Sequence, residues 1–236
     1  EAVKGGFFMS LFANVGVDGT YSLTVWGYTA LVIALIAILL LGNLLFGRKR
    51  AFSAREISFA AMAIALGTVA SMIKIFNMPM GGSVTLLSML FIVLVGNWYG
   101  IGMGLSAAFA YGILQLLLGP YIISLPQMIC DYILAFGALG LSGLFSRSKN
   151  GLIKGYILAV LGRYFFAVLS GVIFFGVYAE GVSFAGHDFS GQPLLYSLSY
   201  NGLYLFTEAV ITLLIIAIPP VRKGLIRIRE MALGEA

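Results

Sequence analysis

The sequence has few charged residues, one cysteine and one histidine. Only 10% of its 236 residues are charged, whereas a soluble domain usually has about 25%. So few charges cannot cover the surface of a water-soluble globule, which excludes a cytosolic enzyme and a disordered chain. The lone Cys130 cannot form an internal disulfide, and with His187 as the only histidine we expect no His/Cys metal site.

Motifs for two kinds of catalysis are also missing. The chain has no Gly-x4-Gly-Lys-Ser/Thr loop, so we do not expect it to hydrolyse ATP through that motif. The segment Gly140-Leu141-Ser142-Gly143 is similar to the serine motif of intramembrane proteases, but that chemistry needs a base beside the serine. His187 falls in a predicted outer loop, whereas Ser142 is near the inner end of the predicted span 121–145, so we interpret Ser142 as a packing residue. We predict that the chain is not an enzyme and carries no cofactor.

Apolar residues are abundant instead. They make up 61% of the chain, and the mean hydropathy is +1.03. The thirty glycines suit membrane helices, which use glycine to pack closely. The net charge of +5 comes from bases in short clusters between apolar runs, which does not indicate nucleic-acid binding. We predict an all-α integral membrane bundle whose solvent is the lipid bilayer.

The apolar runs predict seven membrane spans, since a crossing helix needs about 20 residues. The third is short and could be tilted or partly re-entrant. The first precedes a basic break at 46–53, so we predict residues 1–50 as an outer N-terminal segment with an extra transmembrane helix. Residues 51–236 would form a six-helix unit. The predicted spans are 24–46, 54–76, 84–98, 100–118, 121–145, 152–177 and 195–218.

Basic residues predict the orientation of these spans. Lys and Arg cluster at 48–55, 147–154 and 222–229, and seven crossings place these three segments on one side. Cytoplasmic loops carry an excess of Lys and Arg. We therefore predict a multi-pass protein of the cell membrane with its N-terminus outside and its C-terminus in the cytoplasm.

Three charged residues fall well within the predicted spans, namely Asp131, Arg163 and Glu208. A charge near the centre of a membrane helix costs at least about 2.5 kcal/mol, so such residues are usually functional or paired. One interpretation is a structural ion pair or triad. The other is a polar cavity in which Asp131 attracts a cationic solute.

Aromatic and amide side chains lie at a comparable depth. Gln127 and Asn201 supply the amides. Seven aromatic residues cluster with them near the outer ends of the later spans, namely Tyr121, Phe174, Phe175, Tyr178, Tyr196, Tyr200 and Tyr204. They could form an interfacial aromatic belt. Alternatively, they form a cage for an organic cation or a nitrogen heterocycle, which needs hydrogen-bond donors and acceptors as well as flat walls.

Small residues mark one face of the second predicted span. Ala61 and Ala65 are four residues apart, so another helix can approach closely there. Internal packing and docking of a partner subunit both remain open.

Five segments of the chain have a characteristic order and spacing, namely 80–90, 131–137, 162–166, 170–175 and 196–202. Together they resemble the thiamine-specific S component (ThiT type) of energy-coupling factor (ECF) transporters, and the resemblance covers about residues 53–225. It implies that residues 51–236 form a six-helix substrate-binding domain in the bacterial cell membrane, which binds a vitamin from outside and assembles with a transmembrane coupling subunit and two ATPase subunits. It also implies that Ala61 and Ala65 contact the coupling subunit.

The resemblance implies a substrate-binding role for several residues. Asp131 would stabilise the thiazolium cation, with aromatic walls around it. Asn201 and Gln127 would hydrogen-bond the pyrimidine, Arg163 would orient Asp131, and Glu208 would be a second acidic or supporting group. The loops 77–83 and 178–193 would close over the ligand. The remaining residues that the resemblance implies are Tyr121, Tyr132, Phe175 and Tyr196.

The chain departs from well-known thiamine binders at four positions. It has Ala167 where they often have histidine, Phe175 or Gly82 where some have tryptophan, and Asp131 where some have glutamate. Our hypothesis is a thiamine-binding subunit. The alternatives are an S component for a related heterocyclic vitamin or a thiamine precursor, a stand-alone carrier for an organic cation, and a scaffold without ligand.

Overall fold

The computed structural model describes residues 11–15, 21–27, 29–30, 33, 52–184 and 186–235. Within the N-terminal part, β1 (Ala13–Val15) and β2 (Tyr21–Leu23) pair as an antiparallel hairpin. Most of the predicted span 24–46 lies outside the described residues. The division at residue 50 and the extra N-terminal helix therefore stay predictions.

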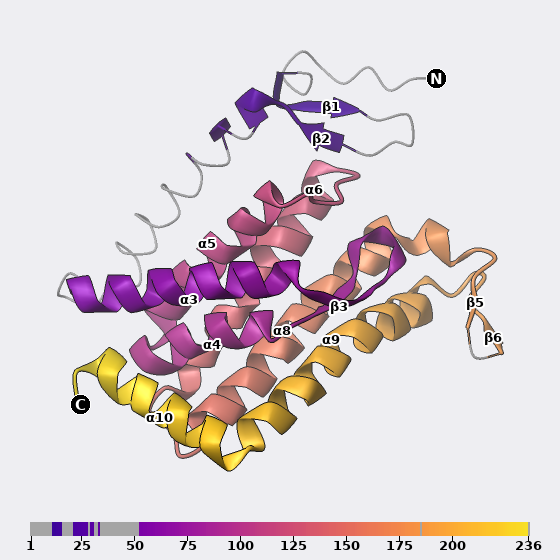
Figure 1. Ribbon diagram of the computed structural model, residues 1–236. Coiled ribbons are helices and arrows are strands. Elements are labelled where there is room, and N and C mark those ends of the chain that lie inside the picture. Colours follow the sequence, from indigo (N-terminus) through magenta and orange to yellow (C-terminus); the bar gives the residue numbers. More distant parts are fainter. Residues whose placement is uncertain are drawn as a thin grey trace.

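From residue 52 onward the chain is a helical bundle (Figure 1), as predicted. Helices α3, α8 and α9 and the continuous segment 125–145 are long and apolar enough to cross a membrane, whereas α4 and α5 are shorter. The segment 125–145 contains α6, the π-helical η2, α7 and the 3-10 helix η3. The bounds are α3 Ala54–Met72, α4 Ser88–Tyr99, α5 Ile101–Leu117, α6 Leu125–Met128, η2 Ile129–Leu134, α7 Ala135–Gly137, η3 Ala138–Phe145, α8 Gly151–Phe174, α9 Pro193–Ala217 and α10 Pro219–Leu233.

The start of α3 follows from its sequence. The Ser53 hydroxyl accepts from the Glu56 backbone N–H at 3.2 Å, and the Glu56 carboxylate accepts from the Ser53 N–H at 2.7 Å. This reciprocal capping box satisfies two N–H groups that a helix start otherwise leaves unpaired.

The sequence analysis predicted no strands, and the predicted span 84–98 is wrong at its start. β3 (Lys74–Asn77), η1 (Pro79–Gly81) and β4 (Ser83–Thr85) form a hairpin between α3 and α4, so the fourth helix begins only at Ser88. Gly81 has φ 93, a conformation that glycine adopts without steric cost. A second hairpin joins β5 (Ser183–Phe184) to β6 (His187–Asp188).

Helix α4 occupies the centre of the bundle and contacts α3, α5, η3 and α8. Small residues allow the close packing beside it, because a Cβ added at Gly140 would lie 2.6 Å from the Leu105 Cα. Ser142 is fully buried and donates to the Val93 carbonyl at 3.2 Å. The interpretation of Ser142 as a packing residue is confirmed.

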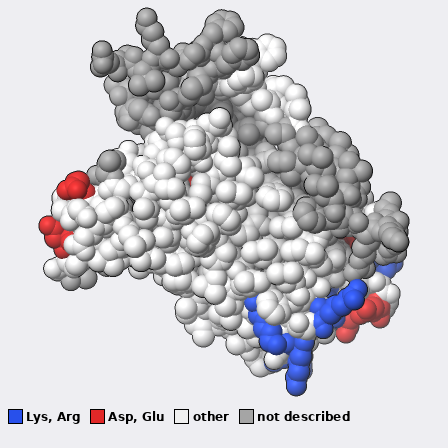
Figure 2. Space-filling view, turned by 180° about the vertical axis from the view of Figure 1, so that it is seen from behind, with Lys and Arg blue, Asp and Glu red and all other residues white. Residues whose placement is uncertain are grey.

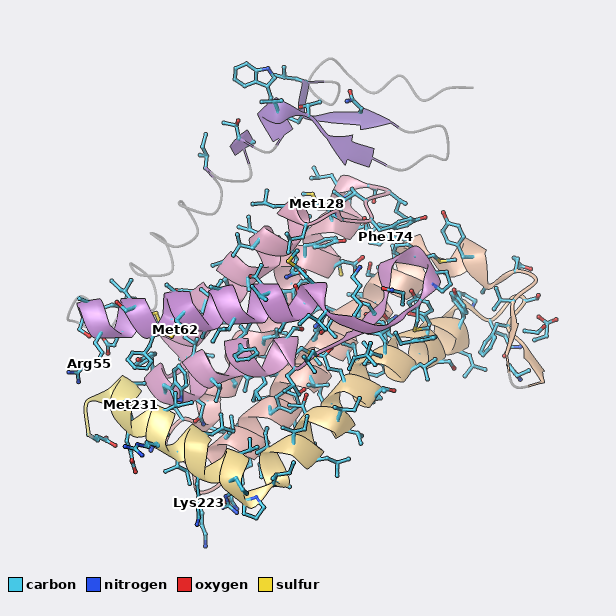
Figure 3. All side chains as sticks on the ribbon, in the orientation of Figure 1. Arg55, Met62, Met128, Phe174, Lys223 and Met231 are labelled. Atoms are coloured by element: carbon cyan, nitrogen blue, oxygen red, sulfur yellow. The ribbon has the colours of Figure 1, made fainter. Side chains whose placement is uncertain are left out.

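Basic side chains gather at one end of the bundle. Arg55, Arg147 and Arg229 come from three separate segments and line one groove there. Figure 3 labels Arg55 and Lys223 at this end and Phe174 at the other. On the face drawn in Figure 2, the blue side chains likewise collect at one end, and most of the remaining surface is uncharged. Described members of the three predicted basic clusters therefore share an end of the bundle; Arg48, Lys49 and Arg50 lie outside the described residues.

Candidate functional site

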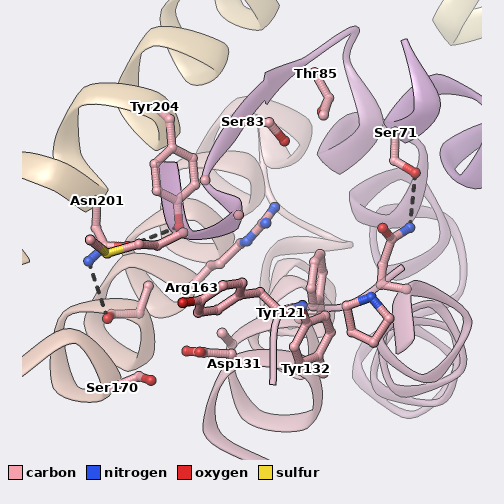
Figure 4. Close-up of a pocket in the computed structure, with 18 of the residues that line it drawn as sticks. Ser71, Ser83, Thr85, Tyr121, Asp131, Tyr132, Arg163, Ser170, Asn201 and Tyr204 are labelled. Carbon is pink, nitrogen blue, oxygen red and sulfur yellow. Dashed lines mark hydrogen bonds between the residues drawn. The ribbon is translucent and has the colours of Figure 1, made fainter. Parts of the chain in front are cut away.

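A cavity of ≈ 390 Å³ lies at the end of the bundle opposite the basic groove. Its walls come from the β3–β4 hairpin, the ends of α3 and α5, the segment 120–136, α8 and α9 (Figure 4). All nine residues that we predicted as substrate-binding line it. They are Tyr121, Gln127, Asp131, Tyr132, Arg163, Phe175, Tyr196, Asn201 and Glu208.

Gln127, not Arg163, holds Asp131 in place. The Gln127 amide nitrogen donates to Asp131 Oδ2 at 2.6 Å and to the Tyr121 carbonyl at 3.2 Å, and its oxygen accepts from the Ile123 N–H at 3.2 Å. Gln127 is only 1% exposed. The amide is therefore occupied by protein groups, and its predicted hydrogen bond to a pyrimidine is replaced by a positioning role.

Asp131 lies on the π-helical segment η2. π-Helical turns are rare and occur frequently at functional sites. The wide turn directs the Tyr132 carbonyl against Gly112 of α5, where a Cβ would collide with it. The Tyr132 hydroxyl accepts from the Tyr121 N–H at 3.0 Å. The π-helical segment thus fixes the position of the Asp131 carboxylate and of the Tyr121 backbone that precedes the segment.

Arg163 points into the cavity beside Asp131 (Figure 4). Its guanidinium lies over the Phe136 ring, 4.2 Å from the centroid, which is a cation–π arrangement. Within the described part of the chain, no ion pair joins Arg163 to Asp131 or Glu208. The structural triad that the sequence left open is therefore wrong, and Asp131 keeps a carboxylate that is not neutralised by direct contact.

Glu208 holds a wall of the cavity. Its carboxylate accepts from the Thr85 N–H at 3.0 Å, the Thr85 hydroxyl at 2.7 Å, the Ser88 hydroxyl at 3.2 Å and the Met89 N–H at 3.3 Å. The side chain is 2% exposed. Glu208 thereby ties α9 to β4 and to the first turn of α4, where a negative charge also favours the helix dipole. We predicted that Glu208 would be either a second acidic group or a supporting group, and these contacts fit the supporting role.

Asn201 is also engaged with the protein. Its amide nitrogen donates to the Ser197 carbonyl at 3.0 Å and to the Ala167 carbonyl at 3.3 Å, and its oxygen accepts from the Tyr204 hydroxyl at 3.0 Å. These contacts bind α9 to α8. An amide oxygen accepts two hydrogen bonds, so Asn201 has acceptor capacity left for a ligand but its nitrogen is committed.

Two sets of aromatic rings form the flat walls of the cavity. The Tyr121 and Phe175 rings are 6.0 Å apart. On α9, Tyr196 lies 5.8 Å from Tyr200, which lies 5.9 Å from Tyr204. Tyr200 and Tyr204 belonged to the predicted aromatic cluster but not to the predicted substrate-binding residues. Their four-residue spacing after Tyr196 places all three on one helix face.

Tyr200 connects the β3–β4 hairpin to α9. Its hydroxyl donates to the Pro79 carbonyl and accepts from the Gly82 N–H at 3.0 Å. A Cβ at Gly82 would lie 2.6 Å from that hydroxyl. The missing aromatic side chain at position 82 therefore leaves the space that Tyr200 fills, and the hairpin lies against the cavity as predicted.

The described residues of the loop 178–193 do not line the cavity, so closure of this loop over a ligand stays a prediction. Phe189 instead packs edge-on against Tyr196, with centroids 5.9 Å apart. The loop supports the aromatic wall from behind.

Ser170 is a polar cavity residue that we did not predict. It lines the cavity near Asp131 (Figure 4), and its buried hydroxyl has no hydrogen-bond partner among the described residues. A buried polar group without a partner calls for an explanation such as a ligand or water. A serine within an apolar span gives no signal that separates this case from ordinary packing.

We expect Tyr200→Phe to accelerate ligand release. The change removes the hydroxyl that joins the hairpin to α9 and keeps the ring. A neutral hydrogen bond contributes about 0.5–1.5 kcal/mol, so the dissociation rate should rise about two- to tenfold. Stopped-flow fluorescence after dilution would measure it. Tyr164→Phe, which removes a hydroxyl bonded to the Leu198 carbonyl away from the hairpin, is the control, and equal rates in both variants would contradict the prediction.

Ala61 and Ala65 lie on the outer face of α3 and are exposed, whereas Ala60, Ala63 and Gly67 face the bundle. Internal packing is therefore wrong as an explanation of the small residues at 61 and 65. Their role as a docking surface stays a prediction.

Comparison with known proteins gives concordant matches. The family model described as "Thiamine transporter protein (Thia_YuaJ)" matches residues 57–227. The thiamine transporter ThiT of Bacillus subtilis is 33% identical over 173 residues, which is 67% of this chain and 84% of that protein. ThiT of Lacticaseibacillus paracasei is 29% identical over 129 residues, covering 48% of this chain and 60% of that protein.

A solved structure also matches. The structure of ThiT from Listeria monocytogenes aligns with a TM-score of 0.59 at 25% identity. The alignment covers 69% of this chain and 91% of that one. Sequence and structure therefore select the same group of proteins.

Proposed function

Because the chain belongs to the thiamine transporter protein family, we propose that its Asp131 cavity is where thiamine binds. The chain is a multi-pass membrane protein and a thiamine-binding S component of an ECF-type importer, not an enzyme. The observation that carries the assignment of the site is a carboxylate without a direct counter-ion beneath aromatic walls, in a cavity of ≈ 390 Å³.

The chemistry of thiamine fits this cavity. Its thiazolium ring is a flat cation, which a carboxylate and aromatic faces stabilise together; each cation–π contact contributes about 0.5–2 kcal/mol. Asp131 would lie near the thiazolium, with Tyr121, Phe175 and Tyr196 as walls. The aminopyrimidine would use the remaining acceptor of Asn201 and the unpartnered hydroxyl of Ser170. A related heterocyclic vitamin remains the alternative substrate.

The cavity would open to the outside of the cell. The groove lined by Arg55, Arg147 and Arg229 lies at the other end of the bundle, and basic ends face the cytoplasm. The C-terminal helix α10, which carries Arg222 to Arg229, would then lie on the cytoplasmic side. Cysteine labelling by a membrane-impermeant reagent in intact cells would test the orientation.

The chain would need partners for transport. Among the described residues we find no ATP-binding loop of the Gly-x4-Gly-Lys-Ser/Thr type, so energy would come from two ATPase subunits acting through a coupling subunit. The exposed small residues Ala61 and Ala65 supply a face on α3 that another helix can approach closely.

Substitution on this face should separate assembly from ligand binding. We expect Ala61→Trp to abolish co-purification with the coupling subunit, because the indole would hold the two helices apart. Thiamine binding should be unchanged, since α3 contributes only its last turn to the cavity. Met62→Trp, an exposed neighbour on a different helix face, is the control. If Ala61→Trp and the unchanged chain co-purify equally with the coupling subunit, this surface is not the docking site.

Thiamine titration of the purified chain tests the function. Binding should quench tyrosine fluorescence at submicromolar thiamine without any partner subunit. Cells should accumulate thiamine only when the coupling and ATPase subunits are co-expressed. Uptake by the chain alone that is sensitive to proton uncouplers would overturn the S-component assignment in favour of a stand-alone carrier, and a flat titration would overturn thiamine as the ligand.

A further inference from the structure

A further groove, here called the anion groove, lies at the basic end of the bundle. It shares Arg147 and Arg229 with the groove that Arg55 lines, and it is distinct from the thiamine cavity. It has a volume of ≈ 450 Å³ and is bordered by the C-terminal turn of α4, the turn 146–153 and α10. Four basic side chains line it, and none of its lining residues is acidic. They are Arg147, Lys149, Arg222 and Arg229.

The long helix α8 begins in this groove. Residues 150–153 form part of its wall, and no side chain caps the N-terminus of the helix. The N-cap residue, Asn150, is in the left-handed conformation. The Gly151 N–H donates to the Ser148 carbonyl at 2.9 Å. The N–H groups of Leu152 and Ile153 and the positive end of the helix dipole remain, and both favour an anion.

A buried polar side chain points independently to a ligand in the same place. Asn97 lines the groove and is 5% exposed, yet its amide makes no hydrogen bond to any described residue. A Cβ built on Gly151 would lie 3.3 Å from Asn97 Nδ2, so the amide nitrogen sits against the first turn of α8. Trp98 Nε1, next along the chain, is a further buried donor without an acceptor.

Donors without acceptors are rare in protein interiors. Here the Trp98 indole N–H is such a donor. The Asn97 amide and the N–H groups of Leu152 and Ile153 lie in the same groove, with four cations and no lining carboxylate. Phosphate oxygens are strong acceptors that bind both helix N-termini and arginine. We propose that the anion groove binds a phosphate group at the cytoplasmic surface of the membrane.

Two sources supply this chemistry. The groove lies at the basic end, where phosphates of anionic lipids in the inner leaflet would be within reach. A soluble phosphate compound in the cytoplasm presents the same oxygens. The experiment therefore has one arm for each source.

Trp98 provides an internal reporter of the groove. The chain has two tryptophans, so Trp26→Phe leaves Trp98 as the only one. In the first arm, this variant in phosphatidylcholine nanodiscs is titrated with inorganic phosphate, with sodium chloride of equal ionic strength as the reference. In the second arm, phosphatidylglycerol replaces a quarter of the lipid. A saturable change in Trp98 emission with phosphate, or a change on adding phosphatidylglycerol, supports the proposal and identifies the source.

Matched charge variants then test the site. Losing a hydrogen bond to a charged group should weaken phosphate binding at least about tenfold in Arg229→Gln and, separately, in Arg222→Gln. Arg227→Gln removes the same charge from the same helix at a position that does not line the groove, and its affinity should change less than about twofold, as expected for an exposed charge. Thiamine binding at the opposite end checks that each variant is folded.

The results that overturn the proposal are distinct. Trp98 emission that is the same in phosphate and in chloride, and the same with and without phosphatidylglycerol, excludes a phosphate site and leaves an acidic protein segment as the class of partner. Equal losses of phosphate affinity in Arg227→Gln and Arg229→Gln would mean that phosphate is attracted to the basic surface in general and is not bound at a site. Neither result bears on the thiamine cavity.

Discussion

Asp131→Asn is expected to weaken thiamine binding by about ten- to 150-fold, because a hydrogen bond to a charged group contributes about 1.5–3 kcal/mol. The substitution keeps the shape of the side chain and an oxygen that can accept from Gln127. It removes only the negative charge, which no contacting cation of the described chain neutralises. Fluorescence or calorimetric titration at one ionic strength measures the change.

The ligand itself provides a control for Asp131→Asn. The aminopyrimidine half of thiamine carries no thiazolium charge, so its weaker binding should change little in the variant. Asp188→Asn is a matched protein control, since Asp188 is exposed on β6 and lies outside the cavity. Equal losses for thiamine and for the neutral pyrimidine would show that Asp131 acts on the shape of the site and not on the cation.

Several residues that line the cavity could be predicted from the sequence, but the contacts that each of them makes could not. Charged and amide residues are so rare in apolar spans that Asp131, Arg163, Gln127 and Asn201 stand out. Their partners depend on geometry that a sequence pattern does not contain. The i, i+4 spacing of Gln127 and Asp131 predicts a shared face, yet it does not tell whether the amide serves the ligand or the carboxylate.

Long-range contacts account for most of what the sequence analysis missed. Tyr200 meets Gly82 across 118 positions in the chain, and Arg163 lies on the Phe136 ring of another helical segment. The sequence analysis missed the β3–β4 hairpin because Ile75 and Phe76 continue the apolar run of α3. In the structure both side chains are exposed. Helix α10 was missed because its basic residues indicate a cytoplasmic segment without defining its structure.

The second large effect is expected for Glu208→Gln, which should destabilise the protein. The carboxylate accepts hydrogen bonds from Thr85, Ser88 and Met89, and an amide would turn an N–H donor toward one or more of these donors. A buried donor left unsatisfied costs about 1–3 kcal/mol. For a chain of this size the unfolding temperature should fall by about 3–10 °C.

Thermal unfolding of Glu208→Gln and of the unchanged chain, followed by fluorescence in the same detergent, would measure this effect. Glu180→Gln, in the exposed loop between α8 and α9, should change the unfolding temperature little, because surface substitutions usually alter stability by less than about 0.5 kcal/mol. Combining Glu208→Gln with Ser88→Ala should cost less than the sum of the two, since both remove the same hydrogen bond. An unchanged unfolding temperature with a large loss of thiamine affinity would instead place the Glu208 carboxylate on the ligand, and the cavity would then hold two charges for one cation.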